Sequence, residues 1–143
     1  MLPAREFRSG RTFLGRLPEG EEVGQALAEF CREQKVQAGW LSAIGTVRRA
    51  VLGYFDQEER TYRRIEVDEP MEIVSCQGNV SLRDGEPFVH LHVVLSGNDG
   101  RAIAGHLFEG IIFVGEFWLQ ECIGPALERR ADAASGLALW EFA

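Results

Sequence analysis

The three histidines of this chain lie close together in the sequence and are the residues best suited to metal chemistry. They are His90, His92 and His106, all within the segment FVHLHVVLSGNDGRAIAGHL. A neutral imidazole is a borderline base that suits zinc and its neighbouring divalent metals. Three imidazoles on one ion leave a position open for another ligand. The pattern therefore predicts a three-histidine divalent metal site with zinc as the metal.

The geometry of a β-strand places two of these histidines on the same side. Successive side chains of a strand point to opposite faces, so His90 and His92 project together while Val89, Leu91 and Val93 project to the other face. Residues two apart in a strand are about 6.5–7 Å apart at the backbone. This separation allows both rings to reach one ion.

The position of the third histidine depends on the turn that precedes it. A two-residue or four-residue loop would place His106 opposite Leu91, on the wrong face. A three-residue loop at Asn98-Asp99-Gly100 instead places His106 opposite His92. Asn and Asp suit a type I turn, and glycine suits the left-handed position of the accompanying bulge, so the sequence favours the three-residue loop.

Further residues bear on the same site. Ala104 and Gly105 are small and would let the backbone approach a neighbour closely, although they could equally serve packing. Glu116 is a lone carboxylate within the apolar segment IIFVGEFWL, and an isolated charge in such surroundings is costly. Glu116 is therefore a candidate fourth ligand or outer-shell partner, with an exposed strand position as the alternative. The alternative for the histidines is three unrelated polar residues satisfied by backbone or solvent.

The hydrophobic pattern predicts an α+β fold with a long, mainly antiparallel sheet and one principal helix. The helix follows Gly20, with Val23, Leu27 and Phe30 at helical spacing. Gly45 is expected to mark a bend or bulge between two strands, and Asp84-Gly85 to form a tight hairpin. The expected strands are 11–17, WLSAI, TVRRAVLGYF, RTYRRIEV, 71–82, 88–95 and a last one from about 108 to 122.

Length and composition predict one globular domain. The chain has 143 residues, of which 45% are hydrophobic, which is enough for one core. Residues 1–124 are expected to form this domain, and 125–143 a C-terminal extension whose apolar tip docks on the domain or on a neighbour. The three cysteines lack a C-x-x-C pair, so buried reduced thiols are expected. No signal peptide or membrane span is visible, and we expect a cytoplasmic protein.

The charge of the chain bears on nucleic-acid binding. The net charge of −7 disfavours contact with a phosphate backbone, because such binding relies on lysine and arginine. A basic patch could still form from arginines near the start and in the Arg48-Arg49 pair, with solvated strand edges and loops as the alternative.

The order of motifs between Gly39 and about Gly124 resembles the PPC domain, named for plants and prokaryotes conserved. The matching segments are AGWLSAIGTVRRAVLGYFD, EPMEIVSCQGNVSLRDGEPFVHLHVVLSGNDGRAIAGHL and a strand that contains Glu116. The resemblance implies a long antiparallel sheet, a homotrimer, and histidines that can hold a metal ion. Ala104 stands where many prokaryotic relatives carry glycine, a departure that should leave the ligands in place.

The resemblance also implies an association with DNA, because in the plant proteins this domain comes after AT-hook DNA-binding motifs in the sequence. This chain lacks the Arg-Gly-Arg-Pro core of an AT hook, and its acidic balance removes the electrostatic support for binding duplex DNA.

The sequence is compatible with three functions. The first is a stand-alone homotrimeric metal-binding module, with a binding or regulatory and assembly role and a small molecule or another protein as its partner. The second is a DNA-associated regulator. The third is a metal-dependent enzyme of unknown substrate, with Glu116 or Asp99 as a base, although no Ser-His-Asp order, P-loop or dinucleotide motif supports catalysis.

Aromatic residues could bury a face between subunits, or could fill the core of the monomer instead. These residues are Tyr54, Phe55, Phe113, Phe117 and Trp118.

Overall fold

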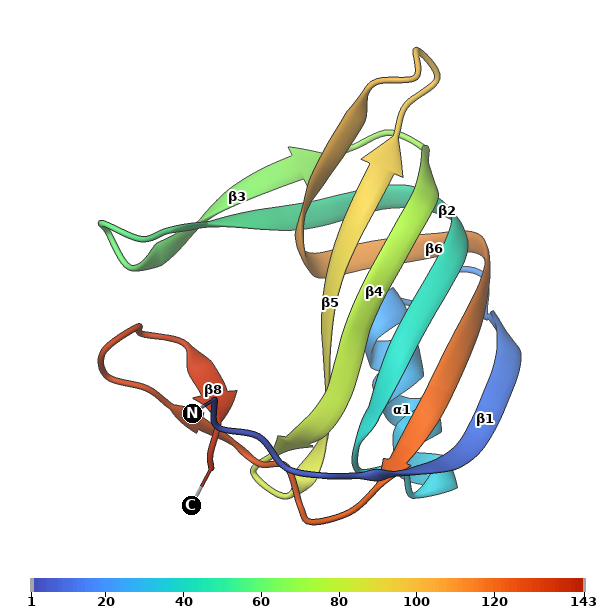
Figure 1. The fold of residues 1–143 in the computed structure, drawn as a ribbon. Coiled ribbons are helices and arrows are strands. Elements are labelled where there is room, and N and C mark those ends of the chain that lie inside the picture. Colours follow the sequence, from blue (N-terminus) through green and yellow to red (C-terminus); the bar gives the residue numbers. More distant parts are fainter. Residues whose placement is uncertain (1, 143) are drawn as a thin grey trace.

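A computed structural model describes residues 2–142. These residues form a curved six-stranded antiparallel sheet packed on one helix, and a separate two-stranded sheet near the C-terminus (Figure 1). This confirms the predicted α+β fold. The elements are β1 (Arg8–Leu17), α1 (Val23–Gln34), β2 (Gly39–Asp56), β3 (Thr61–Val67), β4 (Met71–Arg83), β5 (Glu86–Ser96), β6 (Ala102–Ile123), β7 (Arg129–Ala131) and β8 (Ala138–Trp140).

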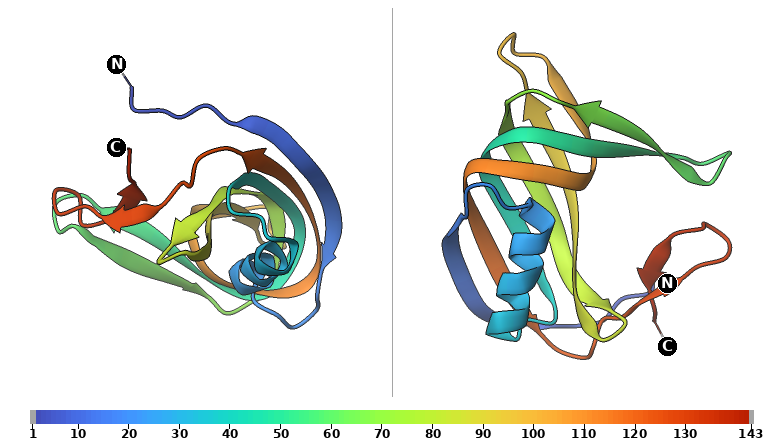
Figure 2. Two further views of the ribbon diagram at one scale, coloured as in Figure 1. Left: turned by 90° about the horizontal axis from the view of Figure 1, so that it is seen from below. Right: turned by 180° about the vertical axis from the view of Figure 1, so that it is seen from behind.

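The two longest strands close the sheet on itself. The strand order is β1-β6-β5-β4-β2-β3, and β2 also pairs with β6. Strand β6 has 22 residues, so it pairs first with β5 and then, after bending, with β2 and β1. The result is a barrel-like ring of strands that curves around α1 (Figure 2). The bend in β6 is important because it separates β5 from β6 near the histidines.

Helix α1 fills the concave side of this ring. The carboxylate of Glu22 caps its first turn by accepting hydrogen bonds from the backbone N–H groups of Gly24 and Gln25. The helix ends at Lys35, which adopts the left-handed conformation with φ of 57°. Its apolar face, including Leu27 and Cys31, is buried against β5 and β6. The predicted helix is thus confirmed.

The structure corrects two predicted strand boundaries. The segments WLSAI and TVRRAVLGYF form one continuous strand, β2, because Gly45 produces a bulge without ending the strand. The last strand begins at Ala102 and not near residue 108, because its first residues pair with β5 across the preceding turn.

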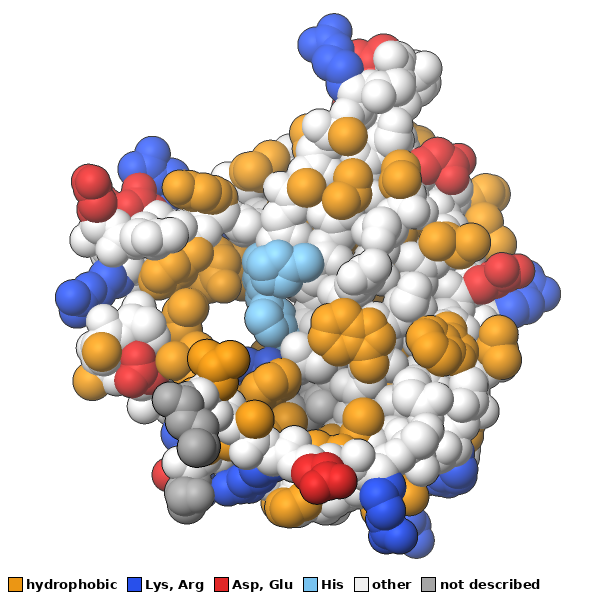
Figure 3. All heavy atoms as spheres, in the orientation of Figure 1, with side chains coloured by type: hydrophobic (Ala, Val, Ile, Leu, Met, Phe, Trp, Pro, Cys, Tyr) orange, Lys and Arg blue, Asp and Glu red, His pale blue; other side chains and the backbone are white. Residues whose placement is uncertain are grey.

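Buried apolar residues from the sheet and α1 form one core. Cys31 and Cys76 are buried and Cys122 is half-buried, and all three are free thiols. Phe117 lies in the core, whereas Tyr54, Phe113 and Trp118 are exposed. Hydrophobic side chains also gather on the outer surface over β4, β2 and β6 (Figure 3). Among the described residues, no helix is long and apolar enough to span a membrane.

Candidate metal centre

The turn between β5 and β6 sets the register of the histidines. Ser96 pairs with Ala102 and His92 pairs with His106, which confirms the predicted three-residue loop. The Gly100 N–H donates a hydrogen bond to the Gly97 carbonyl at 3.0 Å. Gly100 has a φ of 78°, a left-handed conformation that glycine adopts without steric cost. The sequence therefore places the third histidine on the face of the first two.

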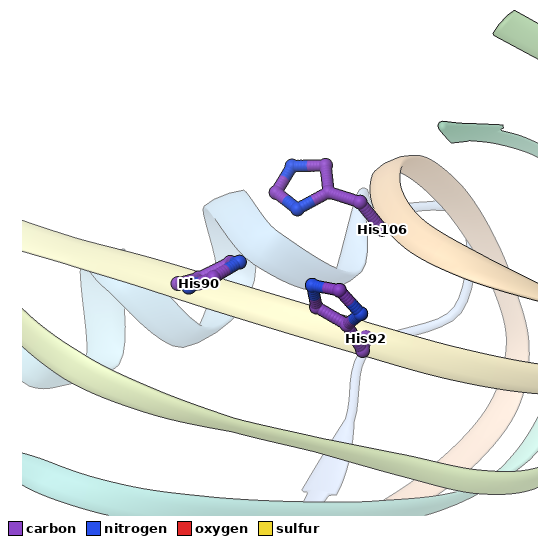
Figure 4. A group of neighbouring side chains, drawn as sticks. All are labelled: His90, His92 and His106. Atoms are coloured by element: carbon purple, nitrogen blue, oxygen red, sulfur yellow. The ribbon is translucent and has the colours of Figure 1, made fainter. Parts of the chain in front are cut away.

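The three imidazole rings converge on one point (Figure 4). The ring centroids of His90 and His92 are 5.1 Å apart, those of His90 and His106 are 5.0 Å apart, and those of His92 and His106 are 5.5 Å apart. One nitrogen from each ring lies within 4.8 Å of the other two. On the other face of β5, Leu91 and Val93 are buried in the core and fix the strand.

A close contact between β6 and β2 positions His106. A β-carbon added at Gly105 would lie 2.7 Å from the carbonyl oxygen of Gly53, which is closer than real β-carbons come. Gly53 is the partner of His106 in the β2–β6 ladder. Glycine at position 105 therefore allows the two backbones to meet, in agreement with the expectation of close approach.

The chemistry of the three rings fits a divalent metal ion. Burial lowers the pKa of His90 and His106 to about 4, with further lowering by nearby positive groups, so both rings are neutral at pH 7. The Nδ1 atom of His106 is buried and has no hydrogen-bond partner among residues 2–142. Two zinc-bound nitrogens in a tetrahedral site are about 3.4 Å apart. Small rotations of the rings would reach this spacing.

Two other candidate residues lie away from this cluster. Glu116 is ten positions beyond His106 on β6, where it pairs with Arg16 and Ile44 and is exposed. The bend that transfers β6 from β5 to β2 explains why the structure does not bring Glu116 to the histidines within one chain. Asp99 lies in the turn, where its carboxylate contacts Arg101.

A cavity of about 530 Å³ adjoins the histidines. It opens where β5 and β6 separate beyond the His92–His106 pair, and the start of α1 and the C-terminal hairpin of β7 and β8 contribute to its walls. Its lining includes His90 and His106 together with the aromatic residues Tyr62, Phe88 and Phe108. In Figure 3 the histidines border an opening rimmed by hydrophobic side chains. A cavity of this size can hold a small organic ligand.

Strand β7 also supplies a residue that the sequence did not indicate as part of this site. Arg129 on β7 is only 9% exposed and lines the same cavity. Its Nη2 atom lies 3.4 Å from Nδ1 of His90. The only sequence signal is an arginine pair, Arg129-Arg130, in a polar tail, and nothing in the pattern shows which member is buried.

This arrangement can be compared with known proteins. The model of the Plants and Prokaryotes Conserved domain, abbreviated PCC or PPC, matches residues 4–123. The chain belongs to this family. A curated relative, the bifunctional protein GlmU of Synechococcus sp. (strain JA-3-3Ab), is 33% identical over 129 residues, which cover 88% of this PPC chain and 20% of the relative. The chain thus spans about a fifth of the length of that protein.

Solved structures match nearly the whole chain. The metal-containing protein AF0104 from Archaeoglobus fulgidus has a TM-score of 0.94 and 44% identity, covering 98% of this chain and 99% of that one. The PPC protein of Pyrococcus horikoshii has a TM-score of 0.93 and 43% identity, with 98% and 97% coverage. A candidate DNA-binding protein from Bacteroides thetaiotaomicron has a TM-score of 0.85 and 26% identity, with 95% and 97% coverage.

Proposed function

We propose that this PPC chain is a metal-binding module that holds one divalent ion, zinc, on His90, His92 and His106. The observation that carries the proposal is the convergence of three imidazoles, two of which burial keeps neutral. Neutral imidazole is the protonation state that binds metal, so the site needs no proton release from these two rings. The similar Archaeoglobus fulgidus protein is described as metal-containing, which supports the proposal.

A zinc titration of EDTA-treated protein tests this proposal. The wild-type chain should bind one zinc ion, and substitution of any one of the three histidines by alanine should weaken binding by at least tenfold. Glu116→Gln is a matched control, because Glu116 is exposed and lies outside the histidine cluster. Equal affinity for wild type and all three histidine variants would exclude this site.

We also propose that the module is a homotrimer with a binding or regulatory and assembly role. The family resemblance implies the trimer, and exposed apolar residues on the outer face support association. Trp118 is 42% exposed beside Leu14, its partner on β1, which is 81% exposed. Burial of such exposed apolar side chains against a second copy of the chain would stabilise an oligomer. Sedimentation at low micromolar concentration should show a trimer, and Trp118→Glu should shift it toward monomer.

We further propose a division into a domain of residues 1–124 and an extension of residues 125–143. In the described part of the extension, Glu128 forms a backbone bridge with Leu82 on β4. Arg129 reaches the histidine cavity, so the extension would contribute to ligand binding. Removal of residues 125–143 should therefore leave zinc binding in place while weakening binding of any ligand in the cavity.

A metal-dependent enzyme is a second candidate, favoured by the cavity beside His90 and His106. A metal held by three imidazoles would supply Lewis acidity to a molecule in the remaining position. The phenol of Tyr62, whose pKa is raised by burial, would stay protonated and could donate a hydrogen bond to that molecule. Hydrolysis of a simple ester that depends on both added zinc and Tyr62 would favour this candidate.

A further inference from the structure

The cavity beside the histidines has an unusual charge for this acidic chain. Its lining contains two arginines, Arg83 and Arg129, and one carboxylate, Glu22. The Glu22 carboxylate accepts hydrogen bonds from the backbone N–H groups of Gly24, Gln25 and Gly110. It therefore caps α1 and does not neutralise either arginine. The cavity of a protein with net charge −7 is thus positive.

Arg129 is a buried cation without a counter-ion in the described part of the chain. No carboxylate of residues 2–142 lies within ion-pair distance of its guanidinium. A buried charge is normally paired, because its removal from water is costly.

Neutral groups hold the Arg129 guanidinium in place. Nε donates to the Ser81 hydroxyl at 2.9 Å, Nη1 to the Ala138 carbonyl at 2.9 Å, and Nη2 to Asn79 Oδ1 at 2.9 Å. Arginine has five N–H groups. Three donate to these neutral groups and the second N–H of Nη2 lies beside Nδ1 of His90, so one N–H on Nη1 remains. These neutral contacts fix a charged group that is ready to bind an anion.

We propose that Arg129 is the recognition group for a small organic carboxylate that binds in this cavity beside the three histidines. The remaining N–H on Nη1 and the positive charge of the guanidinium suit a carboxylate oxygen. The inference rests on the proposed metal site only for the placement of the ligand next to the ion, since Arg129 can bind the anion without metal. The extension thereby becomes part of a ligand site.

The remaining walls of the cavity indicate the body of this carboxylate. Phe88, Phe108 and Leu139 line it, and the Arg129 guanidinium lies 5.5 Å from the ring centroid of Phe88. Aromatic walls favour a flat apolar body next to the anionic group. A volume of about 530 Å³ accommodates a molecule of the size of an aromatic acid. Benzoate is therefore a suitable probe, and benzamide is its uncharged counterpart.

Calorimetric titration of the EDTA-treated full chain with benzoate at low salt tests the proposal. Benzoate should bind saturably and benzamide at least tenfold more weakly. Arg129→Met should weaken benzoate binding about tenfold to 100-fold, as expected for loss of a charge-assisted hydrogen bond. The matched control is Arg130→Met, because Arg130 is the exposed neighbour and pairs with Glu141 outside the cavity.

A second variant avoids the concern that Arg129→Met disturbs folding. Asn79→Asp keeps the size of the side chain and the contact with Nη2, yet provides Arg129 with a counter-ion inside the protein. It should weaken benzoate binding as strongly as Arg129→Met while leaving the thermal melt close to that of the wild type. Equal benzoate affinity for wild type, Asn79→Asp and Arg129→Met would overturn the proposal.

Two further outcomes separate this inference from the metal proposal. Benzoate binding that depends on Arg129, in a protein that fails to bind zinc, would support the carboxylate site and exclude the metal site. Benzoate binding that requires zinc and is unchanged by substitution of Arg129 would overturn the carboxylate site and leave the metal site in place. A titration with inorganic phosphate completes the test. If the protein bound phosphate through Arg129 but did not bind benzoate, the proposal that the ligand is a carboxylate would be overturned.

Discussion

Gly105→Ala should both destabilise the protein and weaken its metal site. The new β-carbon would lie 2.7 Å from the Gly53 carbonyl oxygen, whereas ordinary contacts begin at 3.4 Å, so β6 and β2 must separate by about 0.7 Å. Overpacking of this kind costs about 1–3 kcal/mol, and the reduced freedom of the unfolded chain returns about 0.4–1 kcal/mol. We expect a net loss of about 1–2 kcal/mol in the free energy of unfolding.

The assay combines thermal unfolding with zinc titration. A loss of this size lowers the melting temperature of a chain of this length by roughly 3–8 °C. Because residue 106 follows directly, displacement of β6 should also weaken zinc binding by at least tenfold. Gly97→Ala is the matched control in the same hairpin, since its β-carbon would make only ordinary contacts, the nearest at 3.4 Å. If Gly105→Ala and Gly97→Ala behaved alike in both assays, the β6–β2 contact would not position His106.

Three other predictions concern pH, thiols and DNA. Hydrogen bonds from Arg11 lower the pKa of Glu121 below its ordinary value of 4.5. The Glu121–Arg11 interaction therefore stabilises the fold fully above pH 4.5. This stabilisation disappears as the pH falls through the lower pKa of Glu121 in the folded state. Glu121→Gln should therefore cost about 1–2 kcal/mol at pH 7 and much less at pH 3 in urea titrations, and a constant difference would refute this assignment. Burial raises the pKa of Cys31 and Cys76 to about 12, whereas Cys122 is only half-buried. At pH 8 a thiol reagent should therefore modify Cys122 first. Equal rates of modification at all three cysteines would contradict this prediction. Duplex DNA should not be retained even at 50 mM salt, because the net charge is −7, and tight binding that weakens steeply with salt would instead support a DNA-associated regulator.

Local sequence patterns predict the histidine hairpin well. The alternation of His90 and His92 with Leu91 fixes which residues face the core, and Asn98-Asp99-Gly100 fixes the length of the turn. Both features depend only on strand geometry and on the conformational freedom of glycine. The register of His106 follows from them without knowledge of the rest of the fold.

Longer-range features depend on how one strand changes partners. Glu116 belongs to the same strand as His106, yet a bend transfers β6 from β5 to β2 between them. Sequence alternation does not show such a bend, so Glu116 could not be excluded from the site. The same limit applies to Arg129, whose contacts with Ser81 and Asn79 join residues about 50 positions apart.

The most direct test of the metal site is elemental analysis of freshly purified protein by mass spectrometry. The three-histidine site predicts one zinc ion per chain, which is lost from His90→Ala, His92→Ala and His106→Ala variants. These variants should then melt at the temperature of the metal-free wild-type protein, because an ion bound only to the folded state stabilises it. Metal-free purified protein, together with histidine variants that melt as the wild type does, would contradict the site.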